Sequence, residues 1–204
     1  MGKVLFNMSM SLDGFVAGPN EGPDNPLGDG GEHLFAWYGS GDTDYKMPGG
    51  DWLFKISAAS AAQLDHAIKT SGVIVTGRRT FDITKAWGGR HPVDVPVVVL
   101  THTIPQEWVK DGSPFTFVTD GIESAIEKAK AMAGEKNVAV GSATTLQQCL
   151  KAGLLDEIHI NLAPVLLGGG VRLFECFGME PIKLEQIGVI EGSGVTHSKY
   201  RVVK

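Results

Sequence analysis

The sequence predicts a three-layer α/β domain built on a mixed, mostly parallel sheet of about eight strands. Strand-length segments rich in β-branched residues alternate with segments of helical periodicity, which is the pattern of βαβ units. Residues 73–75 and 97–100 are apolar at consecutive positions, as in strands that are covered on both faces. The last two strand segments alternate in polarity and are joined by the short stretch 191–193, which predicts an antiparallel hairpin at the end of the sheet.

The eight strand segments share a short length and an enrichment in Val, Ile, Thr and aromatic residues. They cover residues 3–10, 73–76, 95–101, 115–119, 137–141, 156–166, 181–190 and 194–203.

Three helices are expected between these strands. The first covers 57–70, with Ser57 as its N-cap and one apolar stripe. The second covers 121–133, where Asp120 and Glu123 stand at capping-box spacing. The third is capped by Ser142, turns apolar side chains inward and ends at Gly153; those side chains are Leu146, Cys149 and Leu150.

We expect residues 1–204 to form a single domain, because this length is sufficient for one sizeable core. Residues 18–51 are rich in Gly and Pro and show little periodicity. A loop of that length in a compact domain is typical of a lid or of a wall beside a substrate, so we expect a loop or lid insertion here.

Composition narrows the choice of partners. The net charge is −5, from 18 basic and 23 acidic residues, which disfavours nucleic acid as a partner. No apolar run approaches the length that spans a bilayer, and the N-terminal residues lack the pattern of a secretory signal, so we expect a cytoplasmic protein. The six histidines lack metal-site spacing, so no metal is expected. Cys149 and Cys176 are expected to be buried thiols.

Several strands end in small or basic residues that suit a phosphate-bearing ligand. Strand 73–76 leads into Gly77, Arg78, Arg79 and Thr80 at the start of a helix, where unpaired N–H groups and guanidinium donors favour an anion. Thr101-His102 and Gly141-Ser142 follow two other strands, and Ser9 to Gly14 close the first one. Because parallel strands end at the same edge of a sheet, we expect these segments to converge on a nucleotide site, although no G-x-G-x-x-G fingerprint is present.

These strings together resemble the dihydrofolate reductase-like superfamily. They are most similar to its branch represented by the C-terminal reductase domain of the bifunctional riboflavin biosynthesis deaminase-reductase. The resemblance covers nearly the whole chain and is specific in combination. It rests on S-L-D-G at 11–14, G-R-R-T at 77–80, L-L-D-E at 154–157 and P-V-L-L-G-G-G at 164–170.

The resemblance implies a dihydrofolate reductase-like fold and a reductase that takes hydride from NADPH and delivers it to a small heterocyclic or sugar-imine substrate. Carried over by motif, the cofactor-binding residues would be Ser9, Val16, Ala17, Gly77, Arg78, Arg79, Thr80, Thr101, His102, Gly141, Ser142, Ala143, Thr144 and Thr145. Arg78, Arg79 and His102 would favour NADPH over NADH, because a 2′-phosphate needs such donors. The chain departs from the riboflavin-pathway reductases at Val140, where they commonly carry an acidic residue.

Hydride transfer to a C=N bond also requires a proton donor, and no motif in the sequence identifies that residue. Dihydrofolate reductases carry an acid on the helix after the first loop, and by resemblance the candidate is Asp51, beside Trp52 and Phe54; a plain helix cap is the alternative for this residue. Asn7 and Asn161 lie on otherwise apolar strands and are candidates for substrate contact, because a buried amide must find partners.

Other functions remain open at this point. A nucleotide-binding module without chemistry, a pterin reductase of the dihydrofolate reductase type, and a homodimer with a structural role are the alternatives. The long apolar segment 158–167 is compatible with a homodimer interface, and burial within one sheet explains it equally well.

Overall fold

The computed structural model describes residues 2–175 and 180–204, and Cys176 lies outside this range. An eight-stranded sheet forms the centre of the molecule, with the strand order β11-β12-β9-β1-β8-β5-β6-β7. The sheet strands are β1 (Val4–Ser11), β5 (Ser71–Gly77), β6 (Val97–Leu100), β7 (Phe115–Val118), β8 (Asn137–Val140), β9 (Glu157–Ala163), β11 (Leu184–Gly192) and β12 (Val195–Val202). All eight strand segments predicted from the sequence are therefore present in one sheet.

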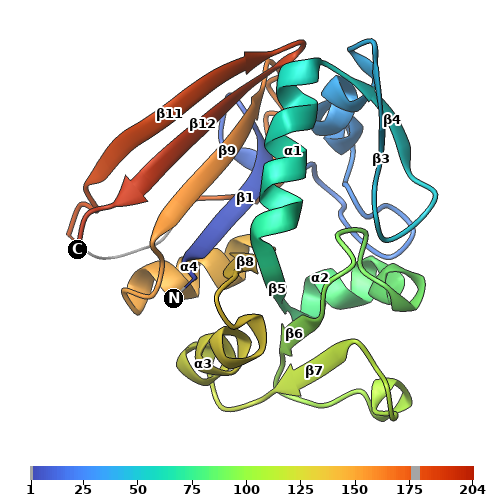
Figure 1. The fold of residues 1–204 in the computed structure, drawn as a ribbon, viewed down its shortest axis with the longest axis vertical. Helices are drawn as coiled ribbons and strands as arrows, with labels where there is room; N and C mark the ends of the chain where they lie inside the picture. The colour runs from blue at the N-terminus through green and yellow to red at the C-terminus, as the bar shows by residue number, and fades with distance from the viewer. Residues whose placement is uncertain (1, 176–179) are drawn as a thin grey trace.

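The sheet is mixed and mostly parallel, as predicted. The six strands from β9 to β7 in the sheet order pair in parallel, whereas β12 is antiparallel to both β9 and β11. Figure 1 shows the β11–β12 hairpin at one side of the sheet and β7 at the other. The carboxyl ends of the six parallel strands consequently lie at the same edge, which is where the functional residues were expected.

Helices cover both faces of the sheet and complete three layers. They are α1 (Ala58–Thr70), α2 (Arg78–Ile83), α3 (Ile122–Ala133) and α4 (Ala143–Lys151). On β5, Val73 and Val75 pack with α3 and α4, whereas Ile74 packs with Phe81 of α2. This alternation reflects the two-residue period of a strand, so both faces of the central strands are buried. Figure 1 shows α1 running along the sheet beside β1 and β5.

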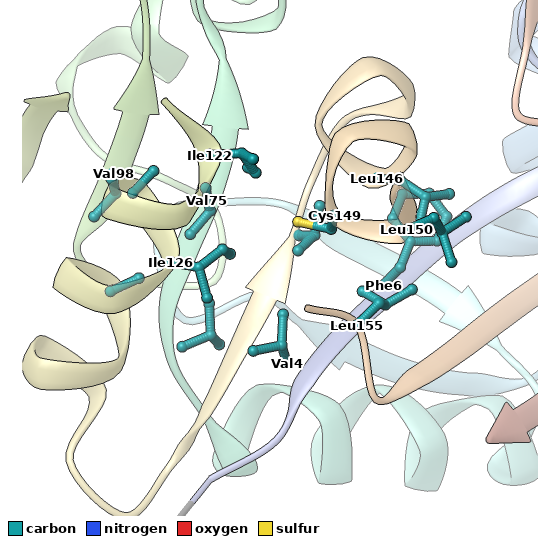
Figure 2. Close-up of a cluster of buried hydrophobic side chains, with 14 of the residues drawn as sticks. Val4, Phe6, Val75, Val98, Ile122, Ile126, Leu146, Cys149, Leu150 and Leu155 are labelled. Atoms are coloured by element: carbon teal, nitrogen blue, oxygen red, sulfur yellow. The ribbon is translucent and has the colours of Figure 1, made fainter. Parts of the chain in front are cut away.

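The largest core cluster lies between the sheet and the α3–α4 layer. Figure 2 shows Phe6 of β1 close to Leu146 and Leu150 of α4, while Ile126 of α3 faces Val75 of β5. Cys149 is a buried thiol in this cluster, as predicted, and burial raises its pKa to about 12. The thiol therefore acts as a small apolar side chain rather than as a nucleophile.

The long segment 18–51 contains more ordered structure than the sequence suggested. It includes a 3-10 helix, η1 (Gly31–Gly39), and β3 (Thr43–Lys46), which pairs with β4 (Leu53–Ile56) in a separate hairpin. Trp37 of η1 is 1% exposed and packs with Ile56 and Val195, which anchors the segment. The short strands β2 (Phe15–Ala17) and β10 (Val171–Arg172) form another pair. Two further 3-10 helices are η2 (Lys85–Gly89) and η3 (Gln106–Trp108).

Helix capping follows the sequence for one of the three predicted N-caps. The Ser57 hydroxyl accepts a hydrogen bond from the backbone N–H of Ser60 at 3.2 Å. The capping-box prediction at Asp120 is wrong, because Gly121 is the N-cap of α3 and the Asp120 carboxylate accepts the Ser124 hydroxyl instead. Ser142 occupies the N-cap position of α4, but its side chain makes no capping hydrogen bond.

In the described part of the chain, no helix combines the length and the hydropathy needed to cross a bilayer.

Asp156 fastens the start of β1 and predicts a pH dependence of stability. Its carboxylate accepts the Val4 N–H at 2.8 Å and Lys204 Nζ at 2.7 Å. Burial raises the pKa of Asp156, but the hydrogen bonds from Lys204 and Val4 outweigh it and hold the pKa below its ordinary value of 3.8. A carboxylate with a depressed native pKa stabilises the fold above its unfolded pKa, and that stabilisation is lost as the pH falls through the native value.

We expect Asp156→Asn to lower the free energy of unfolding at neutral pH and to reduce its decline between about pH 5 and pH 2. Urea denaturation across that range measures both quantities. Asp111→Asn removes the same charge from an exposed turn and serves as the control. An Asp156→Asn profile parallel to that of the wild type would contradict the assignment.

Candidate functional site

A cavity of about 480 Å³ lies at the carboxyl ends of β5, β6 and β7, beside the start of α4. We call it the strand-end cavity. Its walls are Gly77, Arg78, Arg79, Leu100, Thr101, His102, Thr103, Thr119, Gly121, Thr144 and Gln148. The structure thus brings together six of the predicted cofactor residues, namely Gly77, Arg78, Arg79, Thr101, His102 and Thr144.

A cluster of hydroxyl groups joins β5 to α4 at this cavity. The Gly77 N–H donates to Ser142 Oγ at 3.2 Å, and Ser142 Oγ lies 2.6 Å from Thr145 Oγ1. A Cβ atom added at Gly77 would lie 3.4–3.5 Å from the hydroxyls of Thr145, Ser142 and Thr144. The end of β5 therefore lies in close contact with the first turn of the helix.

The first turn of α4 offers backbone donors to a ligand. Because Ser142 turns its hydroxyl toward Gly77, no side chain caps this helix. The N–H groups of a first helical turn have no partner within the helix, and the helix dipole adds positive potential there. Thr144 lies in this turn and lines the strand-end cavity. This arrangement suits a phosphate group.

The two arginines at the start of α2 have different surroundings. Arg78 Nε donates to Asp82 Oδ1 at 2.7 Å, and its Nη1 donates to the Thr103 carbonyl at 2.8 Å. Arg79 Nη2 donates to the Glu21 carbonyl at 2.9 Å, and its Nε donates to the Glu21 carboxylate at 3.2 Å. Both arginines are paired with a carboxylate and keep further N–H donors free, but the Arg78 side chain is 34% exposed and lies against the cavity wall, whereas that of Arg79 is 67% exposed.

One buried polar atom near the turn between β8 and α4 has no hydrogen-bond partner. Among the described residues, Thr76 Oγ1 is the single buried side-chain nitrogen or oxygen in this state. A Cβ atom placed on Gly141 would lie 4.0 Å from Thr76 Cβ, so Thr76 lies just beneath this glycine. An unpaired buried hydroxyl is unfavourable, and Thr76 lines neither the strand-end cavity nor a space beyond Gly141.

A second concavity, which we call the central cleft, lies between the sheet, α1 and η1. Asn7, Ser9 and Asn161 come to it from β1 and β9, and Gly141 borders it at the end of β8. The other walls are Leu5, Met8, Phe35, Tyr38, Met47, Leu64, Ala67, Ile68, Ser71, Ile74, His91, Val93, Ala139 and Val140. Gly141 faces the cleft and Thr144 faces the strand-end cavity, so a single turn borders both spaces.

Aromatic and amide groups give the central cleft its chemistry. Asn161 Nδ2 donates to Asn7 Oδ1 at 3.0 Å, which brings the two predicted substrate residues together. The Trp37 indole N–H donates to Ser9 Oγ at 3.2 Å and holds η1 against β1. Burial, with a smaller contribution from Tyr45, raises the pKa of Tyr38 to about 12. Its hydroxyl therefore stays protonated throughout the physiological pH range.

Asp51 does not have the surroundings expected of a proton donor. It lies in the turn between β3 and β4, its side chain is fully exposed, and it pairs with Lys46 at 3.0 Å. Trp52 is 57% exposed, so the expectation that apolar neighbours desolvate this carboxylate is wrong. The alternative of a helix cap is also wrong, because a strand follows. Asp51 lines neither the strand-end cavity nor the central cleft.

Six of the cofactor residues implied by resemblance line neither cavity, namely Val16, Ala17, Thr80, Ser142, Ala143 and Thr145. Val16 and Ala17 are buried in β2, and Ala143 is buried at the start of α4. Thr80 lies in α2, where its carbonyl accepts the Thr84 hydroxyl.

Asp13 lies at another loop of the same edge of the sheet and fixes two segments together. Its carboxylate accepts the Ser11 hydroxyl and the N–H groups of Leu167 and Gly168. Asp13 thus links the turn after β1 to the glycine-rich segment 164–170 that the sequence singled out.

Several wall residues were not identified from the sequence. Thr119 and Gly121 follow β7 at the same edge, so the rule that located Thr101 could have found them as well. Tyr38 and His91 reach the central cleft from η1 and from the loop after η2, and no periodic pattern marks them. Within residues 2–175 and 180–204, no three side chains of His, Cys, Asp or Glu come together as a metal site would require.

Comparison with known proteins identifies related sequences and folds. The family model of the RibD C-terminal domain matches residues 2–197. The uncharacterized protein YwjB of Bacillus subtilis (strain 168) is 25% identical over 135 residues, with 61% of this chain and 70% of that protein covered.

Two solved structures share the fold. A putative riboflavin biosynthesis protein from Shewanella sp. PV-4 has a TM-score of 0.73 at 22% identity, with 99% of each chain covered. Dihydrofolate reductase from Enterococcus faecalis, complexed with NADP(H), has a TM-score of 0.56 at 14% identity and covers 100% of this chain and 98% of its own. The dihydrofolate reductase-like fold predicted from the sequence is confirmed.

Proposed function

The chain belongs to the RibD C-terminal domain family of reductases, and on that basis we propose that it is an NADPH-dependent enzyme that reduces a small heterocyclic or sugar-imine substrate. The proposed substrate resembles the 5-amino-6-(5-phosphoribosylamino)uracil of riboflavin biosynthesis. The observation that carries the proposal is the turn at residues 141–144, which borders the strand-end cavity on one side and the central cleft on the other.

The residues of the strand-end cavity fit the phosphate groups of NADPH. Arg78 is held in place by Asp82 and the Thr103 carbonyl and has further N–H donors available for the 2′-phosphate. The uncapped first turn of α4 can bind the pyrophosphate through backbone N–H groups.

When bound, NADPH supplies the hydride, and the residues of the chain must orient the substrate and exclude water. Phe35 and Tyr38 of η1 line the central cleft together with Asn7 of β1. Tyr38 keeps its proton at neutral pH, so its hydroxyl is available as a hydrogen-bond donor to the atom that gains charge. We propose that Tyr38, or water reached through the cleft, takes the role first considered for Asp51.

The lining of the central cleft bears on the alternative of a pterin reductase. No Asp or Glu is found among the residues that line the central cleft, all of which are described. A pterin reductase of the dihydrofolate reductase type would need an acid there, so this alternative loses support. A nucleotide-binding module without chemistry remains the second candidate, because it requires no proton donor.

Fluorescence titration and an oxidation assay test the proposal. We expect NADPH to bind with a change in its fluorescence and to bind more tightly than NADH. We also expect NADPH to be consumed when the protein is offered a panel of pterins, flavin precursors and nitro compounds. Binding without consumption would favour the inactive module. The absence of NADPH binding at low ionic strength would refute both candidates.

A further inference from the structure

A chain of five polar side chains runs from the start of α1 to the central cleft. Ser57 Oγ donates to Ser60 Oγ at 3.0 Å, and Ser60 Oγ lies 2.9 Å from His197 Nε2. His197 Nδ1 lies 2.8 Å from Asn161 Oδ1, and Asn161 Nδ2 donates to Asn7 Oδ1 at 3.0 Å. His197 is 4% exposed, and both of its ring nitrogens lie within hydrogen-bond distance of a side chain.

The partners of His197 fix which of its nitrogens carries the proton. Asn161 Oδ1 can only accept a hydrogen bond, so His197 Nδ1 must be the donor. A neutral ring has one N–H, so His197 Nε2 is then an acceptor and the Ser60 hydroxyl donates to it. Burial, and to a lesser extent Lys199, lowers the pKa of His197, which agrees with a neutral ring that has a single N–H.

The donor and acceptor directions of these hydrogen bonds then determine which group Asn7 presents to the cleft. Because Asn161 Oδ1 accepts a hydrogen bond from His197, the Asn161 amide nitrogen faces Asn7. It donates a hydrogen bond to Asn7 Oδ1. The remaining group of Asn7 is its NH₂, for which residues 2–175 and 180–204 provide no acceptor in the hydrogen-bond network. Asn7 lines the central cleft and also a neighbouring cavity of about 160 Å³ beside Glu157 and His159, and we assign this NH₂ to a ligand in the cleft.

A second side chain of the cleft is fixed as a donor by the same reasoning. His91 Nδ1 accepts the backbone N–H of Val93 at 3.1 Å, so the ring proton is on Nε2. Burial lowers the pKa of His91 to about 4, which keeps the ring neutral. No carboxylate lines the cleft to receive a donor from a ligand.

We propose that the relay Ser57–Ser60–His197–Asn161 makes Asn7 a specificity-determining hydrogen-bond donor, so that the substrate presents a carbonyl oxygen or an unprotonated ring nitrogen to it. This inference rests on the proposed function, because it describes the substrate of the same site. A ligand that presents an amino group at this point would meet the NH₂ of Asn7, and two donors facing each other leave both unpaired.

The first test reads the proton position directly and needs no ligand. In protein labelled with ¹⁵N at histidine, NMR should show His197 neutral near pH 7 and protonated at Nδ1, with its signals assigned by their loss in His197→Gln. Protonation at Nε2, or a charged ring near pH 7, would overturn the proposal, because either state removes the argument for the orientation of Asn161.

The second test reverses the relay with one isosteric substitution. In Asn161→Asp, the new carboxylate would still accept the His197 proton, but its other oxygen would also be an acceptor. Asn7 would then turn its NH₂ toward residue 161 and present its oxygen to the cleft. Asn137→Asp is the matched control, because it makes the same change at a residue outside the cleft, whose oxygen accepts the Lys3 N–H at 2.9 Å.

Two probes with the same number of non-hydrogen atoms and no ring nitrogen test this reversal, namely 1-indanone, whose polar group is a carbonyl, and indan-4-amine, whose polar group is an amine. The wild type and Asn137→Asp should bind the carbonyl probe at least about tenfold more tightly, and Asn161→Asp should reverse that preference. An unchanged preference in a folded Asn161→Asp variant, a wild-type preference for the amine, or no binding of either probe would overturn the proposal.

NADPH titration of the same samples separates this inference from the proposed function. If NADPH binds but the probe preference does not follow the relay, only the role of Asn7 is wrong. If NADPH does not bind while His197 shows the expected proton position, the proposed function fails and the relay remains a structural feature.

Discussion

Replacement of Arg78 by alanine is expected to weaken NADPH binding by about 10- to 100-fold. A charge-assisted hydrogen bond contributes about 1.5–3 kcal/mol, and a 2′-phosphate can use the donors that Asp82 and the Thr103 carbonyl leave free. NADH lacks this phosphate, so its affinity should change much less. Fluorescence titration with both dinucleotides at one fixed salt concentration measures the difference.

Arg79→Ala is the matched control for this prediction. It removes the same side chain from the next position, where the guanidinium is turned toward Glu21 and the side chain is 67% exposed, against 34% for Arg78. We expect a smaller loss of NADPH affinity from Arg79→Ala than from Arg78→Ala. Equal losses for NADPH and NADH in Arg78→Ala would show that the arginine does not read the 2′-phosphate.

Leu146→Ala is expected to lower the free energy of unfolding by about 2–5 kcal/mol, the range measured for buried leucines. Leu146 is fully buried in α4 and belongs to the core cluster that contains Phe6 and Leu155 (Figure 2). The substitution leaves a cavity under the helix whose first turn borders the strand-end cavity. Urea denaturation measures the loss, and thermal unfolding should show a lower midpoint.

The control for the core substitution is Leu166→Ala, which makes the same chemical change at a side chain that is 69% exposed. It should alter stability by less than about 0.5 kcal/mol. A Leu146→Ala variant as stable as Leu166→Ala would mean that the α4 layer does not contribute to the core as the structure describes.

The sheet was predictable from the sequence because its strands have a strong local signature. Val97 to Leu100 are apolar without interruption since both faces of β6 are covered, and the C-terminal hairpin alternates because it lies at the side of the sheet. The segment 18–51 was harder to interpret. Its 3-10 helix is held by tertiary packing of Trp37 against Ile56 and Val195, and such long-range contacts leave no periodic pattern.

The candidate site was predictable where it depends on strand ends and not where it depends on loops. Gly77, Thr101 and Thr144 follow consecutive elements of a parallel sheet, so topology alone places them together. Asp51 was chosen by its position after the first loop, and the β3–β4 hairpin directs it to solvent. His91 could not have been predicted as a hydrogen-bond donor of the cleft, because the position of its ring proton depends on a contact with the backbone of Val93.

The central position of β1 has a consequence for the biosynthesis of the protein. The first strand of the chain pairs with β8 and β9, which end at Val140 and Ala163. Until β8 and β9 have been translated, β1 lacks the strands on its two sides. Phe6 and its neighbours are then exposed to unwanted association. Productive folding therefore waits until about four fifths of the chain has emerged, and a nascent chain stalled before β9 should be a chaperone substrate.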